Sequence, residues 1–387
     1  MRIEASERLK KLPPYLFADI ENKVARMMAR GEQIFDLSIG DPDLPTPPDI
    51  VKAMQRAMEE PGSHGYSSSR GEQFFREAVA RWYHVRFGAT LDPAKEICAL
   101  IGSKEGIANI ANALVNRDER IIVPDPGYPV YSNGSTFLSG GRKTIMPLLE
   151  ENAFLPELGK VDAGGAKLMY LNYPNNPTGA IAGMGFLKEA VDFARDNGIL
   201  LCYDNAYSEM SFGEPAHSIL EVPGAIDCCV EFNSCSKTFN MTGSRIGFAV
   251  GAADAIAALA KLKSQVDSGL PIYSQRAGAY ALSQYTGKDP PASVRKNVAT
   301  FAKRMKVLSE GLCQIGISCK TSPATFYLWV KVGGSSIAFA DKLLDSGIVV
   351  TPGIGFGSQG EGHIRFALTK DEQVIRAVVE KMKEIKL

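Results

Sequence analysis

The chain has 387 residues, of which 45% are hydrophobic and 22% are charged, as in an ordinary globular protein of about two domains. Its 43 basic and 43 acidic residues cancel, so no net charge favours nucleic acid or an anionic membrane as a partner. The N-terminal stretch lacks the apolar core of a signal peptide, and no uncharged apolar run is long enough to span a membrane. The seven cysteines include no C-x-x-C pair and the four histidines are scattered, so we expect a reduced, cytoplasmic protein without a metal site.

Apolar runs that alternate with amphipathic segments fill the middle of the chain. The runs that we predict to be strands are 97–101, 120–123, 143–146, 167–172, 199–204, 228–233 and 245–251. Segments whose apolar residues have helix-like spacing separate most of these runs, for example 104–115 and 184–197. Strands that alternate with helices predict βαβ units and a mostly parallel sheet with both faces covered. The last run follows its predecessor after about a dozen residues, which is short for a parallel crossover, so we expect it to be antiparallel.

Both ends of the chain differ from the middle. Residues 1–50 contain one helix-like stretch and a proline-rich turn. The residues after 290 contain a long helical stretch, strand-like runs at 325–332 and 363–368, and a closing helix. These segments are too small to stand alone, so we predict that they pack together against the sheet. The expected parts are an N-terminal arm with part of a small domain (1–50), a large domain that holds the ligand (51–290) and the rest of the small domain (291–387).

Polar side chains follow five of the predicted strands, at the point where each strand ends. Ligands of an open parallel sheet bind beyond the carboxyl ends of its strands, so we expect these side chains to share one crevice. They are Ser103 and Lys104 at a helix start, Tyr128 in P-D-P-G-Y-P, Asn176 in N-N-P-T-G, Asp204 and Tyr207 in D-N-A-Y, and Ser234, Ser236, Lys237 and Arg245 around S-C-S-K.

Each of these residues alone has an ordinary structural explanation. A lysine after a strand is usually solvated, N-P-T-G is a good turn, and an aspartate at a strand end is usually a helix cap. Together they offer a phosphate-binding helix start, an aromatic ring that can stack on a ligand, an amide, a carboxylate, a phenol and an amine. Pyridoxal 5'-phosphate requires this whole set, so we predict it as the cofactor.

The predicted roles follow from the chemistry of the cofactor. Lys237 would form a Schiff base with its aldehyde, while the helix start at Ser103, the nearby hydroxyl groups and Arg245 would hold its phosphate. Asp204 would keep the pyridine nitrogen protonated, which makes the ring an electron sink. Tyr128 would cover one face of the ring. The side chains of Asn176 and Tyr207 would hydrogen-bond the phenolate oxygen and tune the pKa of the imine.

Four motifs occur in the order and spacing of a known family. N-N-P-T-G (175–179), D-x-x-Y (204–207), S-x-S-K (234–237) and G-S-R-I-G-F (243–248) resemble the fold-type I, class I/II aminotransferases, and the resemblance extends from about residue 12 to the C-terminus. It implies the fold of PLP-dependent transferases of type I, with a seven-stranded, mostly parallel sheet domain and a smaller α+β domain from both chain ends.

The resemblance also implies residue roles and an assembly. Lys237 would carry the cofactor and move a proton between the substrate α-carbon and the cofactor. Arg365 would bind the substrate α-carboxylate in a bidentate pair, assisted by Asn176 and by the backbone near Ile39 and Gly40. Tyr66 would reach the phosphate in the neighbouring subunit, which implies a homodimer with shared active sites.

Within this class, the segments 12–20, 37–47, 100–108 and 349–357 resemble the LL-diaminopimelate aminotransferases. That group transfers an amino group from LL-2,6-diaminopimelate to 2-oxoglutarate by a ping-pong mechanism in lysine biosynthesis. This resemblance implies that Tyr15, Tyr66 and Lys104 would also contact the distal end of the substrate. The chain departs from the group at Ser69, where a glutamate that helps to bind the distal ammonium is expected.

Two other activities stay open on the sequence. One is an aspartate or broad-specificity aminotransferase, which would differ only in the distal part of the substrate pocket. The other is a pyridoxal-phosphate lyase or synthase on the same fold, which would share Lys237, Asp204 and Arg365. Each reading requires amino acid substrates, and the two aminotransferase readings require a 2-oxo acid as acceptor.

Overall fold

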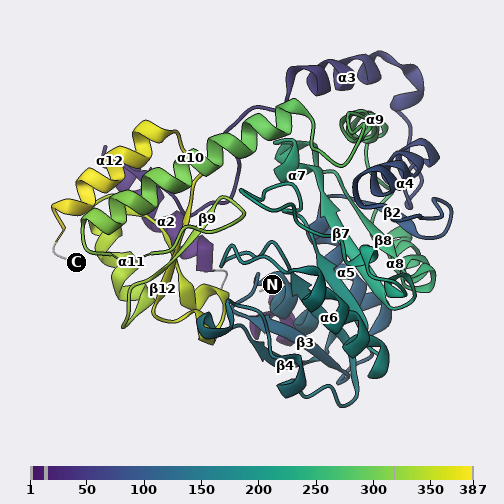
Figure 1. Cartoon of the computed structure of the whole chain (residues 1–387), viewed down its shortest axis with the longest axis horizontal. Coiled ribbons are helices and arrows are strands. Elements are labelled where there is room, and N and C mark those ends of the chain that lie inside the picture. The colour runs from purple at the N-terminus through teal and green to yellow at the C-terminus, as the bar shows by residue number, and fades with distance from the viewer. Residues whose placement is uncertain (1–2, 13–15, 318, 386–387) are drawn as a thin grey trace.

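A seven-stranded sheet forms the centre of the larger part of the protein (Figure 1). The computed structural model describes residues 3–12, 16–317 and 319–385. The strands are β2 (Ile97–Leu100), β3 (Arg120–Asp125), β4 (Arg142–Pro147), β5 (Ala166–Asn172), β6 (Leu200–Asp204), β7 (Cys229–Ser234) and β8 (Gly247–Gly251). All seven predicted strands are therefore present, with ends displaced by at most two residues.

The strands of this sheet lie in the order β2-β8-β7-β6-β5-β3-β4. β8 is antiparallel to β2 and to β7, which confirms the expectation from its short connection. The remaining neighbours pair in parallel. The prediction of a fold-type I sheet that is parallel except for one strand is confirmed.

Helices cover both faces of the sheet, which explains why its strands are nearly continuous apolar runs. On one face α5 (Ser103–Leu114) and α8 (Ala253–Val266) pack on side chains such as Val123 and Phe232. On the other face α4 (Gln73–Phe87) and α9 (Ile272–Ser283) cover one end of the sheet, and α6 (Met184–Asp196) covers the other end. Helix α3 (Pro48–Glu59) packs on α9.

The smaller part of the protein joins both ends of the chain. β1 (Phe35–Asp36) pairs in parallel with β10 (Ile348–Val349). β11 (Thr351–Pro352), β12 (His363–Ala367) and β9 (Tyr327–Lys331) form an antiparallel sheet. Its helices are α10 (Ala292–Gln314), α11 (Ser336–Asp345) and α12 (Glu372–Lys383), which lie together on the left of Figure 1. The division of the chain at residues 50 and 290 stays a prediction.

The remaining helices are short or lie near the N-terminus: α1 (Glu7–Lys10), α2 (Leu16–Ala29) and α7 (Cys235–Thr238). The sequence pattern predicted α10, α12, β9 and β12. It did not predict α11, and it did not predict the two-residue strands, because so short a strand has no period to detect. Among the described residues, none of the helices has the length and apolarity that crossing a membrane requires.

The first residue of β8 lies where three elements of the sheet domain meet. A Cβ atom added to Gly247 would lie 2.7 Å from the carbonyl oxygen of Asn233 at the end of β7 and 2.8 Å from the amide nitrogen of Ser103 at the start of α5. Both are backbone atoms, which cannot move without shifting the strand and the helix. A glycine at this position therefore lets the ends of β7 and α5 approach each other.

Gly247→Ala should lower the free energy of unfolding by about 1–3 kcal/mol, because the extra methyl group overpacks the junction of β7, β8 and α5. The matched control is Gly243→Ala in the preceding turn, where an added Cβ atom meets no heavy atom within 4 Å. Urea denaturation of both variants measures the difference. Equal stability of the two variants would contradict this explanation.

Candidate active site

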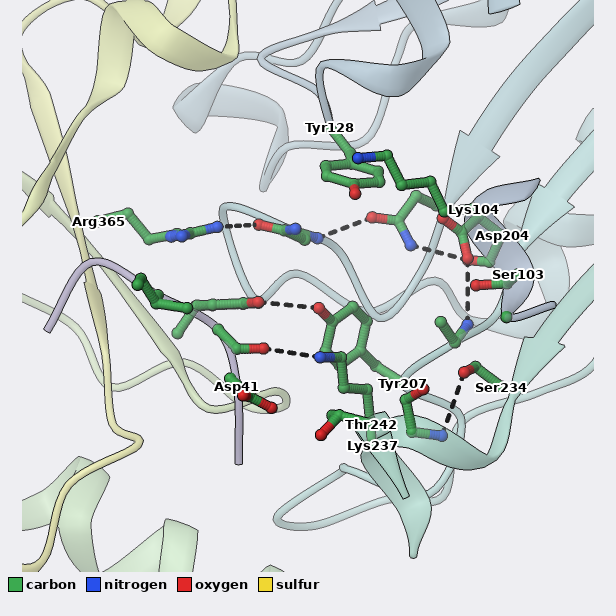
Figure 2. Close-up of a pocket in the computed structure, with 18 of the residues that line it drawn as sticks. Asp41, Ser103, Lys104, Tyr128, Asp204, Tyr207, Ser234, Lys237, Thr242 and Arg365 are labelled. Atoms are coloured by element: carbon green, nitrogen blue, oxygen red, sulfur yellow. Dashed lines mark hydrogen bonds between the residues drawn. The ribbon is translucent and has the colours of Figure 1, made fainter. Parts of the chain in front are cut away.

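A cavity of about 380 Å³ lies beyond the carboxyl ends of β5, β6 and β7, between the large sheet and the smaller part of the protein (Figure 2). Most of the predicted site residues line it, namely Ile39, Gly40, Ser103, Lys104, Tyr128, Asn176, Asp204, Tyr207, Ser234, Ser236, Lys237, Arg245 and Arg365. Tyr66 does not line this cavity and is 91% exposed. Tyr15 lies outside the described residues.

Lys237 lies in α7, directly after β7, and its side chain enters the cavity from below in Figure 2. Its Nζ donates a hydrogen bond to the carbonyl oxygen of Gly40 at 2.7 Å. Burial lowers the pKa of Lys237 to about 8; the charge of Asp41 opposes this shift, and Arg245 and Arg365 add to it. About a tenth of this amine is therefore neutral, and nucleophilic, at pH 7, far more than for a lysine of ordinary pKa.

Asp204 ends β6 and is buried. Its Oδ2 accepts a hydrogen bond from the Tyr131 hydroxyl at 2.6 Å, and its Oδ1 accepts from the backbone N–H of Ala206 at 3.3 Å. Burial outweighs these hydrogen bonds and raises the pKa of Asp204 to about 6. A cationic group placed against this carboxyl would favour its ionised form and be stabilised by it.

Arg365 lies in the middle of β12 and is 3% exposed. Its Nη1 donates to Oδ1 of Asn176 at 2.8 Å, and its Nη2 donates to the carbonyl oxygen of Ser38 at 2.7 Å. The guanidinium also lies over the rings of Tyr327 and Phe356, 4.2 and 4.8 Å from their centres. These contacts fix the plane of the guanidinium at the wall of the cavity.

Hydrogen-bond donors for an anion gather at the opposite side of the cavity. Gly102, with φ +74°, precedes α5 and provides no side-chain cap, so the first amides of this helix face the cavity without an intrahelical acceptor. The hydroxyl groups of Ser103, Ser234 and Ser236 line the same region. Arg245 is held there by hydrogen bonds from Nη1 to the Thr242 carbonyl (2.8 Å) and from Nη2 to the Ile101 carbonyl (3.2 Å).

Comparison with known proteins shows the family. Residues 32–382 match the family described as aminotransferase class I and II. The chain belongs to this family. It is 46% identical to the LL-diaminopimelate aminotransferases of Syntrophobacter fumaroxidans, over 100% of both chains, and of Aquifex aeolicus, over 99% of this chain and 100% of the relative.

Solved structures of other proteins share the fold. The substrate-bound structure of BacF from Bacillus subtilis has a TM-score of 0.94 at 35% identity and covers 100% of this chain and 98% of BacF. A probable N-succinyldiaminopimelate aminotransferase from Thermus thermophilus has a TM-score of 0.89 at 34% identity, covering 96% of this chain and all of that one. The protein is thus an aminotransferase that depends on pyridoxal phosphate.

The residues of this aminotransferase fit that cofactor. The cavity combines a lysine of lowered pKa, a buried carboxyl group that a cation would ionise, and a set of phosphate donors at the start of α5. Tyr128 lines the same space, and the Nζ of Lys104 lies 5.9 Å from the centre of its ring. The donor set therefore matches the amine, ring-nitrogen and phosphate contacts that the cofactor needs.

Several lining residues of the aminotransferase were missed by sequence reasoning: Asp41, Asn172, Ala206, Thr242, Tyr327 and Phe356. Asp41 and Thr242 could have been found, since one follows Gly40 and the other lies between Lys237 and Arg245. Tyr327 gave no signal, because an aromatic residue in a strand is usually a core residue. Tyr131, which hydrogen-bonds Asp204, lies in the helical segment Val130–Phe137 and was also missed, because a buried tyrosine there is usually a core residue.

The lowered pKa of Lys237 predicts the pH dependence of cofactor uptake. The neutral amine is the reactive form, so the rate at which the cofactor-free aminotransferase takes up pyridoxal phosphate should rise with pH through about 8, instead of near 10.5, the ordinary pKa of a lysine. Stopped-flow absorbance at fixed cofactor concentration measures this rate, and Lys237→Arg is the control without a reactive amine. A rate that still rises steeply above pH 10 would contradict the lowered pKa.

Proposed function

We propose that this aminotransferase moves the amino group of LL-2,6-diaminopimelate to 2-oxoglutarate by a ping-pong mechanism in lysine biosynthesis, in the cytoplasm. The observation that carries the reaction type is the convergence of Lys237 and Arg365 on one segment of backbone. Their cationic groups donate to the carbonyl oxygens of Gly40 and Ser38. An α-amino acid has its amino group and carboxylate on one carbon, so it can meet both side chains at once.

The donor is proposed from the relatives. Two curated proteins named LL-diaminopimelate aminotransferase are 46% identical over essentially their full lengths. The segment after Tyr66 favours a second candidate, a broad-specificity aminotransferase, because it reads S-S-S-R and has no carboxylate for a distal ammonium. The next carboxylate, that of Glu72, accepts a hydrogen bond from the Ser68 amide at 3.1 Å, which holds it within its own loop.

The chemistry divides between the cofactor and the protein. When bound, pyridoxal phosphate supplies an electron sink that makes the substrate α-proton acidic. In our proposal the Nζ of Lys237 would hold the cofactor and, as a free amine, would be the base that takes and returns the substrate α-proton. Asp204 holds the ring nitrogen in its protonated state. Arg365, assisted by Asn176 and the backbone of Ile39 and Gly40, binds the α-carboxylate and so orients the C–H bond.

The remaining site residues hold the cofactor in place. We propose that the start of α5 at Ser103 and Lys104, the hydroxyl groups of Ser234 and Ser236, and Arg245 bind the phosphate. Tyr128 covers one face of the ring. Asn176 and Tyr207 donate hydrogen bonds to the ring oxygen. Lys104 and Tyr66 would also contact the distal end of the substrate.

We also propose a homodimer in which Tyr66 completes the site of the partner. Tyr66 is 91% exposed, which is unusual for a tyrosine in an ordered loop. The loop is held in place, since Oγ of Ser67 donates to the carbonyl oxygen of Leu270 at 2.7 Å. An anchored loop that presents an aromatic side chain to solvent is typical of an interface between subunits.

The donor specificity can be tested by absorbance of the cofactor-loaded protein, with single amino acids added in the absence of an acceptor. The panel is LL-diaminopimelate, its meso form, glutamate, aspartate, lysine and alanine. We expect LL-diaminopimelate and glutamate to convert the cofactor band to that of its amine form, and aspartate to leave it unchanged. In Lys237→Ala no donor should convert the band to that of the amine form. Conversion by aspartate but not by LL-diaminopimelate would retain the aminotransferase and reject the proposed donor.

The shared site predicts complementation between two inactive variants. Lys237→Ala and Tyr66→Ala homodimers should each have strongly reduced turnover. In a mixed dimer, the Tyr66→Ala subunit keeps its own Lys237 and receives Tyr66 from its partner, so one of the two sites is intact. Turnover of purified, differently tagged mixed dimers measures this. Mixed dimers no more active than the two parents would show that Tyr66 does not act across the interface.

A further inference from the structure

Tyr327 connects three separate features of the cavity. It begins β9 and is 3% exposed. Its hydroxyl oxygen lies 2.9 Å from that of Tyr207, which is the dashed contact at the Tyr207 hydroxyl in Figure 2. The guanidinium carbon of Arg365 lies 4.2 Å from the centre of the Tyr327 ring. A Cβ atom added to Gly40 would lie only 1.8 Å from the Tyr327 hydroxyl oxygen.

The position of Tyr327 is fixed by backbone pairing, so these contacts do not depend on a flexible side chain alone. Tyr327 is the register partner of Ala367 in β12, two residues beyond Arg365. Its ring packs edge-on against Phe326, with centres 4.8 Å apart. Tyr207, in contrast, follows β6 of the large sheet. The hydroxyl pair therefore joins the two parts of the protein across the cavity.

The hydroxyl pair constrains the single proton of Tyr207. Burial raises the pKa of Tyr207 well above its ordinary value, so its phenol stays protonated. Either hydroxyl of the pair can be the donor. When Tyr327 donates to the oxygen of Tyr207, the Tyr207 proton must point to another acceptor, and Tyr207 lines the cavity. A hydroxyl that accepts one hydrogen bond is also polarised into a stronger donor.

We propose that Tyr327 is a positioning residue that directs the Tyr207 hydroxyl into the cavity and supports the plane of Arg365. Its hydroxyl sets the strength of the hydrogen bond that Tyr207 offers to the cofactor ring oxygen, and its ring forms the surface on which the guanidinium rests. Gly40 leaves the space that the hydroxyl occupies. This role rests on the part of the proposed function that places Tyr207 at the ring oxygen, and it is independent of the amino donor.

Two substitutions separate the hydroxyl from the ring. In Tyr327→Phe the Tyr207 hydroxyl becomes a weaker donor, the ring oxygen becomes a better base, and the pH midpoint of the bound cofactor's absorbance should rise by about half to one unit. Tyr327→Leu also removes the surface under Arg365, so KM for 2-oxoglutarate should rise about tenfold more than in Tyr327→Phe.

The decisive measurement is a double-mutant cycle on the absorbance midpoint. If Tyr327 acts through Tyr207, adding Tyr327→Phe to Tyr207→Phe should produce no further shift. Tyr285→Phe is the matched control, because this buried hydroxyl donates to Glu209 at 2.9 Å, outside the cavity. It should change the melting temperature and leave the midpoint unchanged.

Two results would overturn the proposal: no shift in Tyr327→Phe, or the same shift when Tyr207 is already phenylalanine. Melting temperatures and cofactor content of each variant show that the folded, loaded protein is being compared. The midpoint is recorded without substrate, so it tests Tyr327 even if LL-diaminopimelate proves not to be the donor. If LL-diaminopimelate fails to convert the cofactor band but the double-mutant cycle shows the expected coupling, only the proposed substrate is rejected.

Discussion

The site depends on one short piece of backbone, residues 38–41, that accepts hydrogen bonds from two cationic side chains, one buried and one half-buried. Arg365 donates to the carbonyl oxygen of Ser38 and Lys237 to that of Gly40. β1 directly before this piece is held by pairing with β10, and Leu37 continues the contact through its N–H to the carbonyl of Val349. The N-terminal segment is thereby fixed against strands from the end of the chain. If this piece moved, the hydrogen bonds that position the amine of Lys237 relative to the guanidinium of Arg365 would be lost.

Hydrogen bonds and ring contacts fix the geometry of these two cations. The amide of Asn176 and the ring of Tyr327 orient the guanidinium of Arg365 and do not compete with a substrate carboxylate for its charge. Removal from water also makes the lysine easier to deprotonate and lowers its pKa to about 8. Burial in the cavity makes these charged groups costly to desolvate. It also strengthens their interaction with an anionic substrate and shifts their pKa values.

A second buried carboxyl group supports the segment that follows β6. Glu231 of β7 is fully buried and accepts hydrogen bonds from Tyr83 (2.9 Å), Asn205 (2.8 Å) and Ser218 (2.6 Å). Burial raises the pKa of Glu231 to about 7 in spite of these donors. Asn205 directly follows Asp204, so this network holds the backbone on which the Asp204 and Tyr207 side chains stand. The hydrogen bonds to the Glu231 carboxylate therefore tie the segment after β6 to β7 beneath the site.

The sequence by itself determined the seven strands of the sheet, the direction of β8, and most of the residues that line the cavity from the large sheet, although it missed Asn172, Ala206 and Thr242. These follow from local patterns, since each of Ser103, Asp204 and Lys237 stands next to the strand that carries it. Only the tertiary structure decided that Arg365 meets Asn176, 189 residues away, and that Tyr327 meets Tyr207, 120 residues away. Apolar periodicity identifies the strand that carries a residue, but which distant strand it faces depends on how the two parts of the chain pack, and that packing leaves no short-range signal.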